Sequence, residues 1–191
     1  LIGHSMGSYM SRKYASIYGD ELDGVIFLGT GNQPKAVVDS GLKLAHIAKL
    51  VRGERYRSEL LNTIMFGAYN KRIKDNRTAN DWLTKDTKIV DEYLSDPKCS
   101  YKFTANAYIG FLNVIKYDID KKSIAKTPDK LPVLFASGLE DPVGDYGKGV
   151  KKAFKMYTKY VDNVELYLYE DDRHELHSET DREDIFSDLY E

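Results

Sequence analysis

The stretch Leu1–Gly7 reads L-I-G-H-S-M-G, an apolar run that turns into the start of a helix at a serine between two glycines. A G-x-S-x-G pattern at such a point predicts a sharp strand-to-helix turn, because small residues at Gly3 and Gly7 let the backbone pass close to its neighbours. The turn would present the Ser5 hydroxyl above a sheet and the Met6 N–H at the helix start, where an oxyanion can be stabilised. Ser5 is therefore the candidate nucleophile, and a glycine-flanked helix cap is the structural alternative.

The rest of the chain alternates strands and helices around a long helical segment. Apolar runs predict buried strands at Val25–Leu28, Leu131–Ser137 and Val164–Tyr169. Helical periodicity appears after Ser5, at 37–51, 58–69, 84–94, 104–117 and 146–160, and near the C-terminus. The pattern predicts an α/β fold with a mostly parallel sheet covered by helices. Its core would comprise residues 1–33 and 127–191, with a helical cap insertion at 34–126.

A loop acid follows the strand predicted at 131–137. The loop contains Asp141, with Glu140 and Asp145 beside it. By composition alone a loop acid is often a solvated turn residue, which is the alternative here. Asp141 is the preferred candidate because of its place directly after a strand.

A histidine follows the strand predicted at 164–169. His174 is the preferred base, and His177, three residues further on, is its rival. His46 falls within a helical pattern and is expected to be a partly exposed or core side chain.

Serine, aspartate and histidine thus occur in the order expected when parallel strands carry a nucleophile, an acid and a base at their C-terminal ends. His174 would take the proton of Ser5, while Asp141 holds the imidazole in the right tautomer. Acylation of Ser5 and release by water would follow. This is hydrolysis through an acyl-enzyme.

Composition argues against several other classes of protein. The 28 basic and 30 acidic residues leave a net charge of −2, and the lysines are spread along the sequence, so nucleic acid is not an expected partner. No apolar run approaches the roughly 18 residues that span a bilayer, so no transmembrane segment is expected. The pair His174-x-x-His177 lacks a third ligand at a recognisable spacing, and no Gly-rich phosphate loop follows a strand. No metal or cofactor is therefore expected.

The cysteine content and the first residues bear on location. Cys99 is the single cysteine, so no intrachain disulfide is expected, which fits a reducing, cytoplasmic compartment. The sequence opens at Leu1 without an initiator Met or a signal-peptide pattern, so secretion stays open.

These residues resemble the α/β-hydrolase superfamily, and within it the monoacylglycerol lipase and lysophospholipase-like branch of serine aminopeptidase-type hydrolases. The resemblance covers nearly the whole chain and implies a small-molecule acyl ester as substrate. It rests on the elbow Gly3–Gly7, the acid loop Gly138–Gly149, R-H-E at 173–175 and S-E-T at 178–180. In the helical segment, D-W-L-T-x-D at 81–86, D-x-Y at 91–93, D-P at 96–97 and F-T at 103–104 are similar to the cap of that branch.

The beginning departs from the branch, whose members carry several strands and a first helix before the elbow. Those residues include the loop that supplies a second oxyanion-hole N–H. The resemblance therefore implies a missing N-terminal segment, so the chain is expected to be a fragment or half of an assembly. Alone it would be poorly stable or expose a sheet edge.

Apolar residues of the helical segment are expected to form a groove for an acyl chain, with ordinary core packing as the alternative. The candidate substrate-binding residues are Phe66, Phe103, Tyr108 and Phe111, accompanied by Ile64, Met65 and Leu112. We therefore predict a serine esterase acting on monoacylglycerols, lysophospholipids or similar lipids. The alternatives are an aminopeptidase-type serine peptidase on the same fold, or an inactive fragment or binding protein that retains the three residues.

Overall fold

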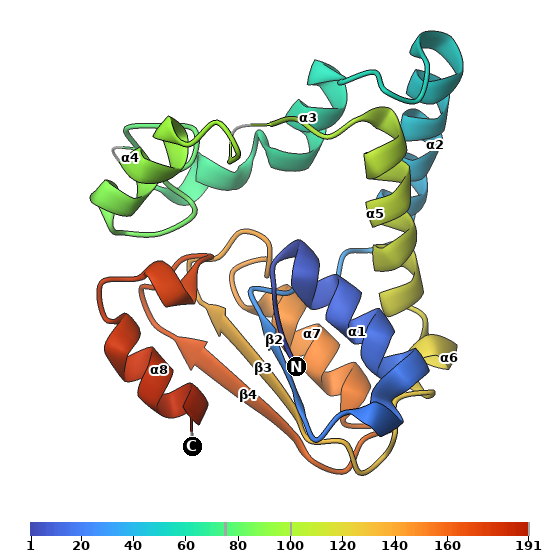
Figure 1. Ribbon diagram of the computed structural model, residues 1–191, viewed down its shortest axis with the longest axis vertical. Helices are drawn as coiled ribbons and strands as arrows, with labels where there is room; N and C mark the ends of the chain where they lie inside the picture. Colours follow the sequence, from blue (N-terminus) through green and yellow to red (C-terminus); the bar gives the residue numbers. More distant parts are fainter. Residues whose placement is uncertain (75, 100, 191) are drawn as a thin grey trace.

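The computed structural model describes residues 1–74, 76–99 and 101–190, and within them it contains a four-stranded parallel sheet (Figure 1). The strands lie in the order in which they occur in the chain, and every neighbouring pair is parallel. They are β1 (Ile2–His4), β2 (Val25–Leu28), β3 (Val133–Gly138) and β4 (Val164–Tyr169). The three strands predicted from the later apolar runs are confirmed. Because all strands run in one direction, the loops that follow them leave the sheet at one edge.

One face of the sheet is covered by α1 (Met6–Tyr18) and α7 (Lys148–Tyr157), which share a hydrophobic core with β2 and β3. Phe27 and Phe135 are paired in register on β2 and β3 and are fully buried. Both contact the ring of Tyr157, with centroids 5.8 and 5.2 Å apart and nearly perpendicular planes. Such edge-to-face contacts fix the position of α7 over the sheet.

The other face is covered by a single 3-10 turn, η3 (Leu176–Ser178), and the last helix, α8 (Arg182–Tyr190). Leu28 of β2 and Ala136 of β3 point to this side, because successive side chains of a strand alternate between its faces. They pack against Leu176 and Ile185. The central strands β2 and β3 are therefore largely buried on both sides, as the apolar run at Val25–Leu28 predicts for β2.

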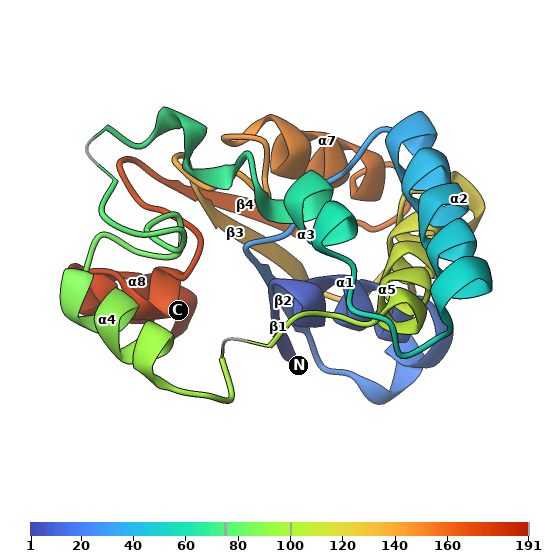
Figure 2. The same cartoon turned by 90° about the horizontal axis from the view of Figure 1, so that it is seen from above.

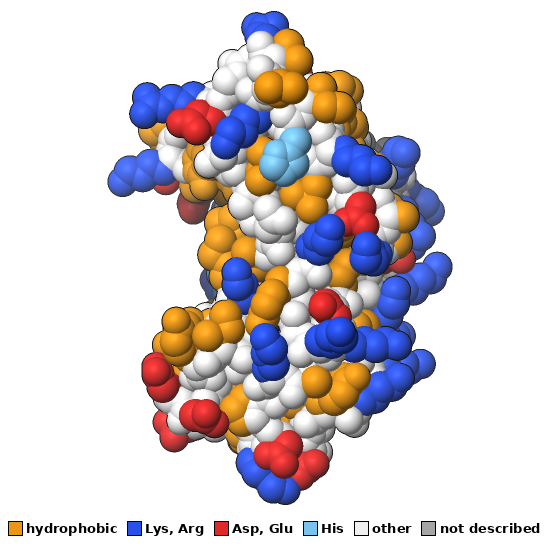
Figure 3. Space-filling model, turned by 90° about the vertical axis from the view of Figure 1, so that its right-hand side faces the viewer, with side chains coloured by type: hydrophobic (Ala, Val, Ile, Leu, Met, Phe, Trp, Pro, Cys, Tyr) orange, Lys and Arg blue, Asp and Glu red, His pale blue; other side chains and the backbone are white. Residues whose placement is uncertain are grey.

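The outer face of α7 gathers lysines that are spread along the sequence. Residues at helical spacing lie on one side of a helix, and all of these side chains are exposed: Lys148, Lys151, Lys152, Lys155 and, just beyond the helix, Lys159. Lys and Arg side chains gather along one edge of the molecule in the space-filling view (Figure 3). Lysines that are spread along the sequence thus lie together on this part of the folded surface.

A helical segment arches over the carboxyl ends of the strands (Figures 1 and 2). Of the described residues between 34 and 126, none is in a strand. The helices are α2 (Lys35–Arg52), α3 (Glu59–Phe66), α4 (Thr87–Ser95), α5 (Ala105–Asp118) and α6 (Lys121–Ile124), with the 3-10 turn η2 (Tyr69–Arg72). The segment therefore covers the edge of the sheet from which the loops after the strands emerge.

Side-chain caps explain where several of these helices begin. Ser58, Asp86 and Thr104 each accept a hydrogen bond from a backbone N–H in the first turn of α3, α4 and α5. The helix predicted at 84–94 therefore starts later than expected, after its cap. The helix predicted at 58–69 ends at Phe66, and η2 follows it. The single turn of α6 is too short to be predicted from periodicity.

β1 lies at an edge of the sheet and has β2 as its strand neighbour. Apolar side chains on β1 and α1 are exposed, among them Ile2, Met10 and Ile17. An exposed edge strand beside apolar surface is a feature that favours association with another chain or segment. In residues 1–74, 76–99 and 101–190, none of the helices has the length and apolar character needed to cross a membrane.

A buried arginine joins α1, α5 and the loop after β2. The Arg12 guanidinium donates hydrogen bonds to the main-chain oxygens of Gly31 (2.8 Å) and Asp118 (2.9 Å). The Asp118 carboxyl is also buried, and neither of its oxygens has a hydrogen-bond partner among the described residues. Burial raises the pKa of Asp118 to about 7, although the charge of Arg12 acts in the opposite direction.

We expect Asp118→Asn to change how stability depends on pH. Native Asp118 binds its proton more tightly than the unfolded chain, whose pKa is 3.8. Its contribution to stability is therefore present at low pH and is lost as the pH rises toward about 7. Because an amide does not titrate, the Tm of the variant should rise relative to that of the wild type between about pH 4 and about pH 7. Thermal unfolding of both proteins across this range measures the difference in Tm. A difference that does not change with pH would contradict a raised pKa for the buried Asp118 carboxyl.

Candidate active site

Ser5 lies at a strained turn between β1 and α1. Its φ is 53°, a left-handed backbone value that costs a serine about 1–3 kcal/mol. The turn is held because the Ser5 N–H donates to the Leu28 carbonyl (3.0 Å) and the Ser5 carbonyl accepts from the Ser8 N–H (2.9 Å). The predicted strand-to-helix turn is therefore present, and strain at one residue is a frequent property of functional sites.

The close approach within this turn occurs at Gly3. A Cβ at Gly3 would lie 2.2 Å from the Ser11 hydroxyl oxygen and 2.5 Å from the Gly7 carbonyl oxygen. A Cβ at Gly7 would meet nothing within 4 Å. The expectation that both glycines are needed for space is thus wrong for Gly7, because its Cβ direction points away from β1 although its backbone lies close to Gly3.

Asp141 is the carboxylate that the structure places against the predicted base. It is fully buried, its Oδ1 accepts a hydrogen bond from the Val143 N–H (2.8 Å), and its Oδ2 lies 3.0 Å from Nδ1 of His174. The neighbouring Glu140 and Asp145 are exposed. Of the three candidate acids, Asp141 is the one in contact with a histidine.

His174 is 1% exposed, and its two ring nitrogens have different environments. With Nδ1 on the carboxylate of Asp141, the proton is assigned to Nδ1, which leaves Nε2 as an acceptor. Nε2 is buried and has no hydrogen-bond partner among the described residues. Gly29, with a φ of 56°, makes room for the ring, because a Cβ there would lie 3.0 Å from the imidazole. A buried imidazole with one oriented and one free nitrogen can act as a general base.

The other histidines take different positions. His4 lies between His174 and His177, with ring centroids 4.7 and 4.8 Å away, and its Nε2 donates to the His174 carbonyl (3.1 Å). Burial, with a contribution from His174, lowers the pKa of His4 to about 3, so this ring is neutral at physiological pH. His177 is exposed at the edge of the cluster, and His46 is exposed on α2.

A side chain of the helical segment contacts the imidazole of His174. The ring of Trp82 lies 5.0 Å from that of His174, and the Trp82 carbonyl accepts from the His174 N–H (3.4 Å). Trp82, His4 and Gly29 are not among the site residues predicted from the sequence. In the sequence, Trp82 is marked only as the single tryptophan, His4 only as the neighbour of Ser5, and Gly29 only as a glycine directly after a strand. None of these features by itself indicates a functional role.

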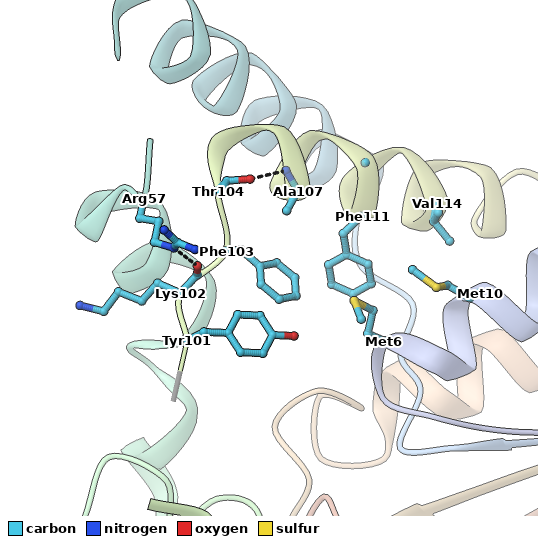
Figure 4. A pocket seen from close by; sticks show the side chains of 11 residues that line it. Met6, Met10, Arg57, Tyr101, Lys102, Phe103, Thr104, Ala107, Phe111 and Val114 are labelled. Carbon is cyan, nitrogen blue, oxygen red and sulfur yellow. Dashed lines mark hydrogen bonds between the residues drawn. The ribbon is translucent and has the colours of Figure 1, made fainter. Parts of the chain in front are cut away.

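A groove of about 560 Å³ lies between the start of α1 and α5, bordered by the segment before α5 (Figure 4). Its walls are mainly apolar, and Met6 joins it to the turn of Ser5. The space-filling view also shows a hollow between the upper and lower parts of the molecule, with hydrophobic side chains along it (Figure 3). The lining residues are Met6, Met10, Arg57, Tyr101, Lys102, Phe103, Thr104, Ala107, Gly110, Phe111 and Val114.

Two of the four predicted substrate-binding residues line this groove, namely Phe103 and Phe111. Tyr108 does not line it and is buried with Ala45 and Leu61 on the side of α5 that packs on α2. Phe66 also lies outside the groove lining and packs, partly buried, against the same core. A role of these two residues in substrate binding stays a prediction. Of the accompanying residues, Leu112 and Met65 join helix packing and Ile64 is exposed.

Met6 is placed as an oxyanion donor would be. It is the first residue of α1, so its N–H belongs to the first turn and has no intrahelical acceptor. Within the described parts of the chain there is no cluster of three or more His, Cys, Asp or Glu side chains that could hold a metal ion. Of the three predicted catalytic residues, the structure joins His174 to Asp141 by a hydrogen bond. Nε2 of His174 has no hydrogen-bond partner among the described residues, so Ser5 is linked to the histidine loop through its neighbour His4 instead.

Several solved structures have a fold similar to that of this chain. A carboxyl esterase from Bacillus coagulans, solved with glycerol, is 28% identical with a TM-score of 0.87 over 98% of this chain. A lipase in an open form is 29% identical with a TM-score of 0.86 over 98% of this chain. A soluble variant of monoglyceride lipase from Saccharomyces cerevisiae is 23% identical over 98% of this chain, with a TM-score of 0.71, and shows the fold alone. This chain spans 60%, 62% and 61% of those three chains.

Comparison with curated proteins gave no match. A model of the family described as serine aminopeptidase, S33, matches residues 1–181. The chain therefore belongs to this family of α/β-hydrolases.

Proposed function

We propose that the chain carries the catalytic residues of a carboxylic ester hydrolase that acts through an acyl-enzyme on Ser5. The observation that carries the proposal is the buried hydrogen bond between Asp141 and His174, which leaves Nε2 of His174 free. His4, the neighbour of Ser5, is in ring contact with that imidazole. A nucleophile, a base and an orienting acid are the set that activates a serine.

In the proposed reaction, Nε2 of His174 removes the hydroxyl proton as Oγ of Ser5 attacks the ester carbonyl carbon. Asp141 stabilises the imidazolium, and the Met6 N–H donates to the oxyanion. The proton then passes from Nε2 to the leaving alcohol as the C–O bond breaks. A water molecule, deprotonated by the same nitrogen, then attacks the acyl carbon. The bond from this carbon to Oγ of Ser5 breaks, the proton on Nε2 returns to Oγ, and the carboxylic acid leaves.

We propose a monoacylglycerol, lysophospholipid or similar lipid as the substrate. The apolar groove reaches the Ser5 turn through Met6, and its mainly apolar lining along α5 suits an acyl chain. Two similar proteins are by name a lipase and a monoglyceride lipase. In this proposal, residues 34–126 act as a cap over a core formed by 1–33 and 127–191, and cap side chains such as Phe103 and Phe111 contact the acyl chain.

A serine peptidase is the second candidate, because the family description names aminopeptidases and the same three residues serve both reactions. A third is a binding protein or inactive fragment that retains the residues. Turnover of acyl esters and aminoacyl amides, compared side by side, distinguishes the first two, and absence of turnover and labelling in folded protein supports the third.

A fluorophosphonate probe should add one label per chain, because it reacts with a serine that is activated by a histidine. Intact mass measures the label. Ser5→Ala should abolish it, and His174→Ala should slow it by at least about 1,000-fold. Ser16→Ala, a change at another serine of α1, is the matched control and should keep full labelling. Labelling that persists in Ser5→Ala, or an unlabelled folded wild type, would contradict the proposed nucleophile.

Phe111→Ser should raise KM for long-chain esters by about tenfold and for short-chain esters by much less, because burial of a phenyl ring on an acyl chain contributes about 1.5–3 kcal/mol. Initial rates on p-nitrophenyl esters of increasing chain length measure the difference. Tyr108→Phe is the control, since Tyr108 is buried away from the groove, and it should keep the wild-type dependence on chain length. Equal changes for short and long esters would show that the groove does not hold the acyl chain.

A further inference from the structure

The loop that carries His174 is joined to the helical segment by a buried polar network around Glu179. Glu179 follows η3 and is fully buried. Its Oε1 accepts a hydrogen bond from the Arg173 N–H (2.8 Å), and its Oε2 accepts from the Lys85 N–H and the Thr84 hydroxyl (3.0 Å each). One carboxylate thus binds the residue before His174 and two residues of the loop before α4.

This loop, residues 81–86, also contacts the base itself. The His174 N–H donates to the Trp82 carbonyl (3.4 Å), and the Glu175 N–H donates to the Leu83 carbonyl (2.7 Å). The ring of Trp82 lies against the imidazole of His174. A shift of this loop would therefore move both the Trp82 carbonyl, which accepts from the His174 N–H, and the Trp82 ring, which lies against the imidazole.

Two cations strengthen the same junction. Nη1 of Arg173 donates to two main-chain carbonyls of the 81–86 loop, at 2.7 and 3.0 Å, and the Lys85 ammonium pairs with the buried Asp172. Burial raises the pKa of Glu179, while the hydrogen bonds from the Arg173 and Lys85 N–H groups favour its charged form. A polar network of this density in the interior holds one arrangement of the two loops.

We propose that Glu179 is a positioning residue that holds the imidazole of His174 in the geometry needed to deprotonate Ser5. The proposal rests on the proposed function. Glu179 touches neither substrate nor reacting atoms and acts by locking the histidine loop to the 81–86 loop. The helical segment then has two roles. It lines the substrate groove, and its loop at residues 81–86 holds His174 in place.

The contacts explain why a carboxylate is required. Both oxygens of Glu179 face hydrogen-bond donors, whereas a glutamine offers one acceptor oxygen and one NH2 donor. Whichever way the amide is turned, the NH2 faces the fixed N–H of either Arg173 or Lys85. Glu179→Gln therefore loses hydrogen bonds on one side of the network without creating a cavity.

Labelling kinetics with the fluorophosphonate and hydrolysis of a short p-nitrophenyl ester test the proposal. Glu179→Gln should lower the labelling rate and kcat by about 10- to 100-fold, because misplacement of a catalytic group by about 1 Å has effects of this size. KM should stay within about twofold of the wild type, since the groove is intact. The matched control is Ser58→Ala, which removes a buried hydrogen bond at the start of α3. It should lower Tm and leave kcat unchanged.

A second measurement does not depend on turnover. Trp82 is the only tryptophan, and its ring contacts His174, so its emission reports a displacement of the histidine loop. In Glu179→Gln the emission maximum should shift, whereas Ser58→Ala should match the wild type. If the wild type is neither labelled nor active, the proposed function fails. A shifted Trp82 signal in Glu179→Gln would still support the positioning role.

A folded Glu179→Gln that is labelled at the wild-type rate and keeps the wild-type Trp82 signal overturns the proposal. If this variant does not fold, Thr84→Val replaces it, because valine keeps the shape and removes the hydroxyl that contacts Glu179, the Ser178 carbonyl and the Asp86 N–H. Thr84→Val should slow labelling about threefold to tenfold, because the hydrogen bonds of this hydroxyl are lost. A wild-type rate and an unchanged Trp82 signal in this second variant would overturn the proposal as well.

Discussion

The parallel pairing of β2, β3 and β4 is the constraint on which the candidate site depends. The β3 and β4 strands pair in register, so the loops that follow them leave the sheet side by side. One loop carries Asp141 and the other His174, and a hydrogen bond of 3.0 Å joins them. The packed rings of Phe27, Phe135 and Tyr157 keep the strands in position. A strand that moved would open a cavity in this close-packed core.

The helical segment depends on the same sheet through two separate junctions. At one end α5 packs on α1, where Arg12 is hydrogen-bonded to the Asp118 carbonyl. At the other end, residues 81–86 bind the histidine loop through Glu179. The apolar groove lies between α1 and α5, so the segment that shapes the groove also supports the imidazole. The shape of the groove and the position of the His174 imidazole are therefore linked by one structural element.

Burial explains how three neighbouring histidines differ. His4 is held neutral by its surroundings and donates to a carbonyl, so it connects the Ser5 turn to the histidine loop. His177 is exposed and contacts the cluster through His4 alone among these rings. His174 combines a buried carboxylate on Nδ1 with an unpaired Nε2. The environment, rather than the residue type, separates the base candidate from its rivals.

The sequence by itself determined the class of fold, the three later strands and the positions of Ser5, Asp141 and His174 at strand ends. These follow from residue periodicity and turn chemistry, which are local properties of a chain. It did not separate Tyr108 from Phe111, because both lie on apolar stripes of α5. Which stripe packs on α2 and which lines the groove depends on the rotation of one helix against another. The role of Glu179 likewise arises from contacts with residues more than ninety positions away, which only the tertiary structure brings together.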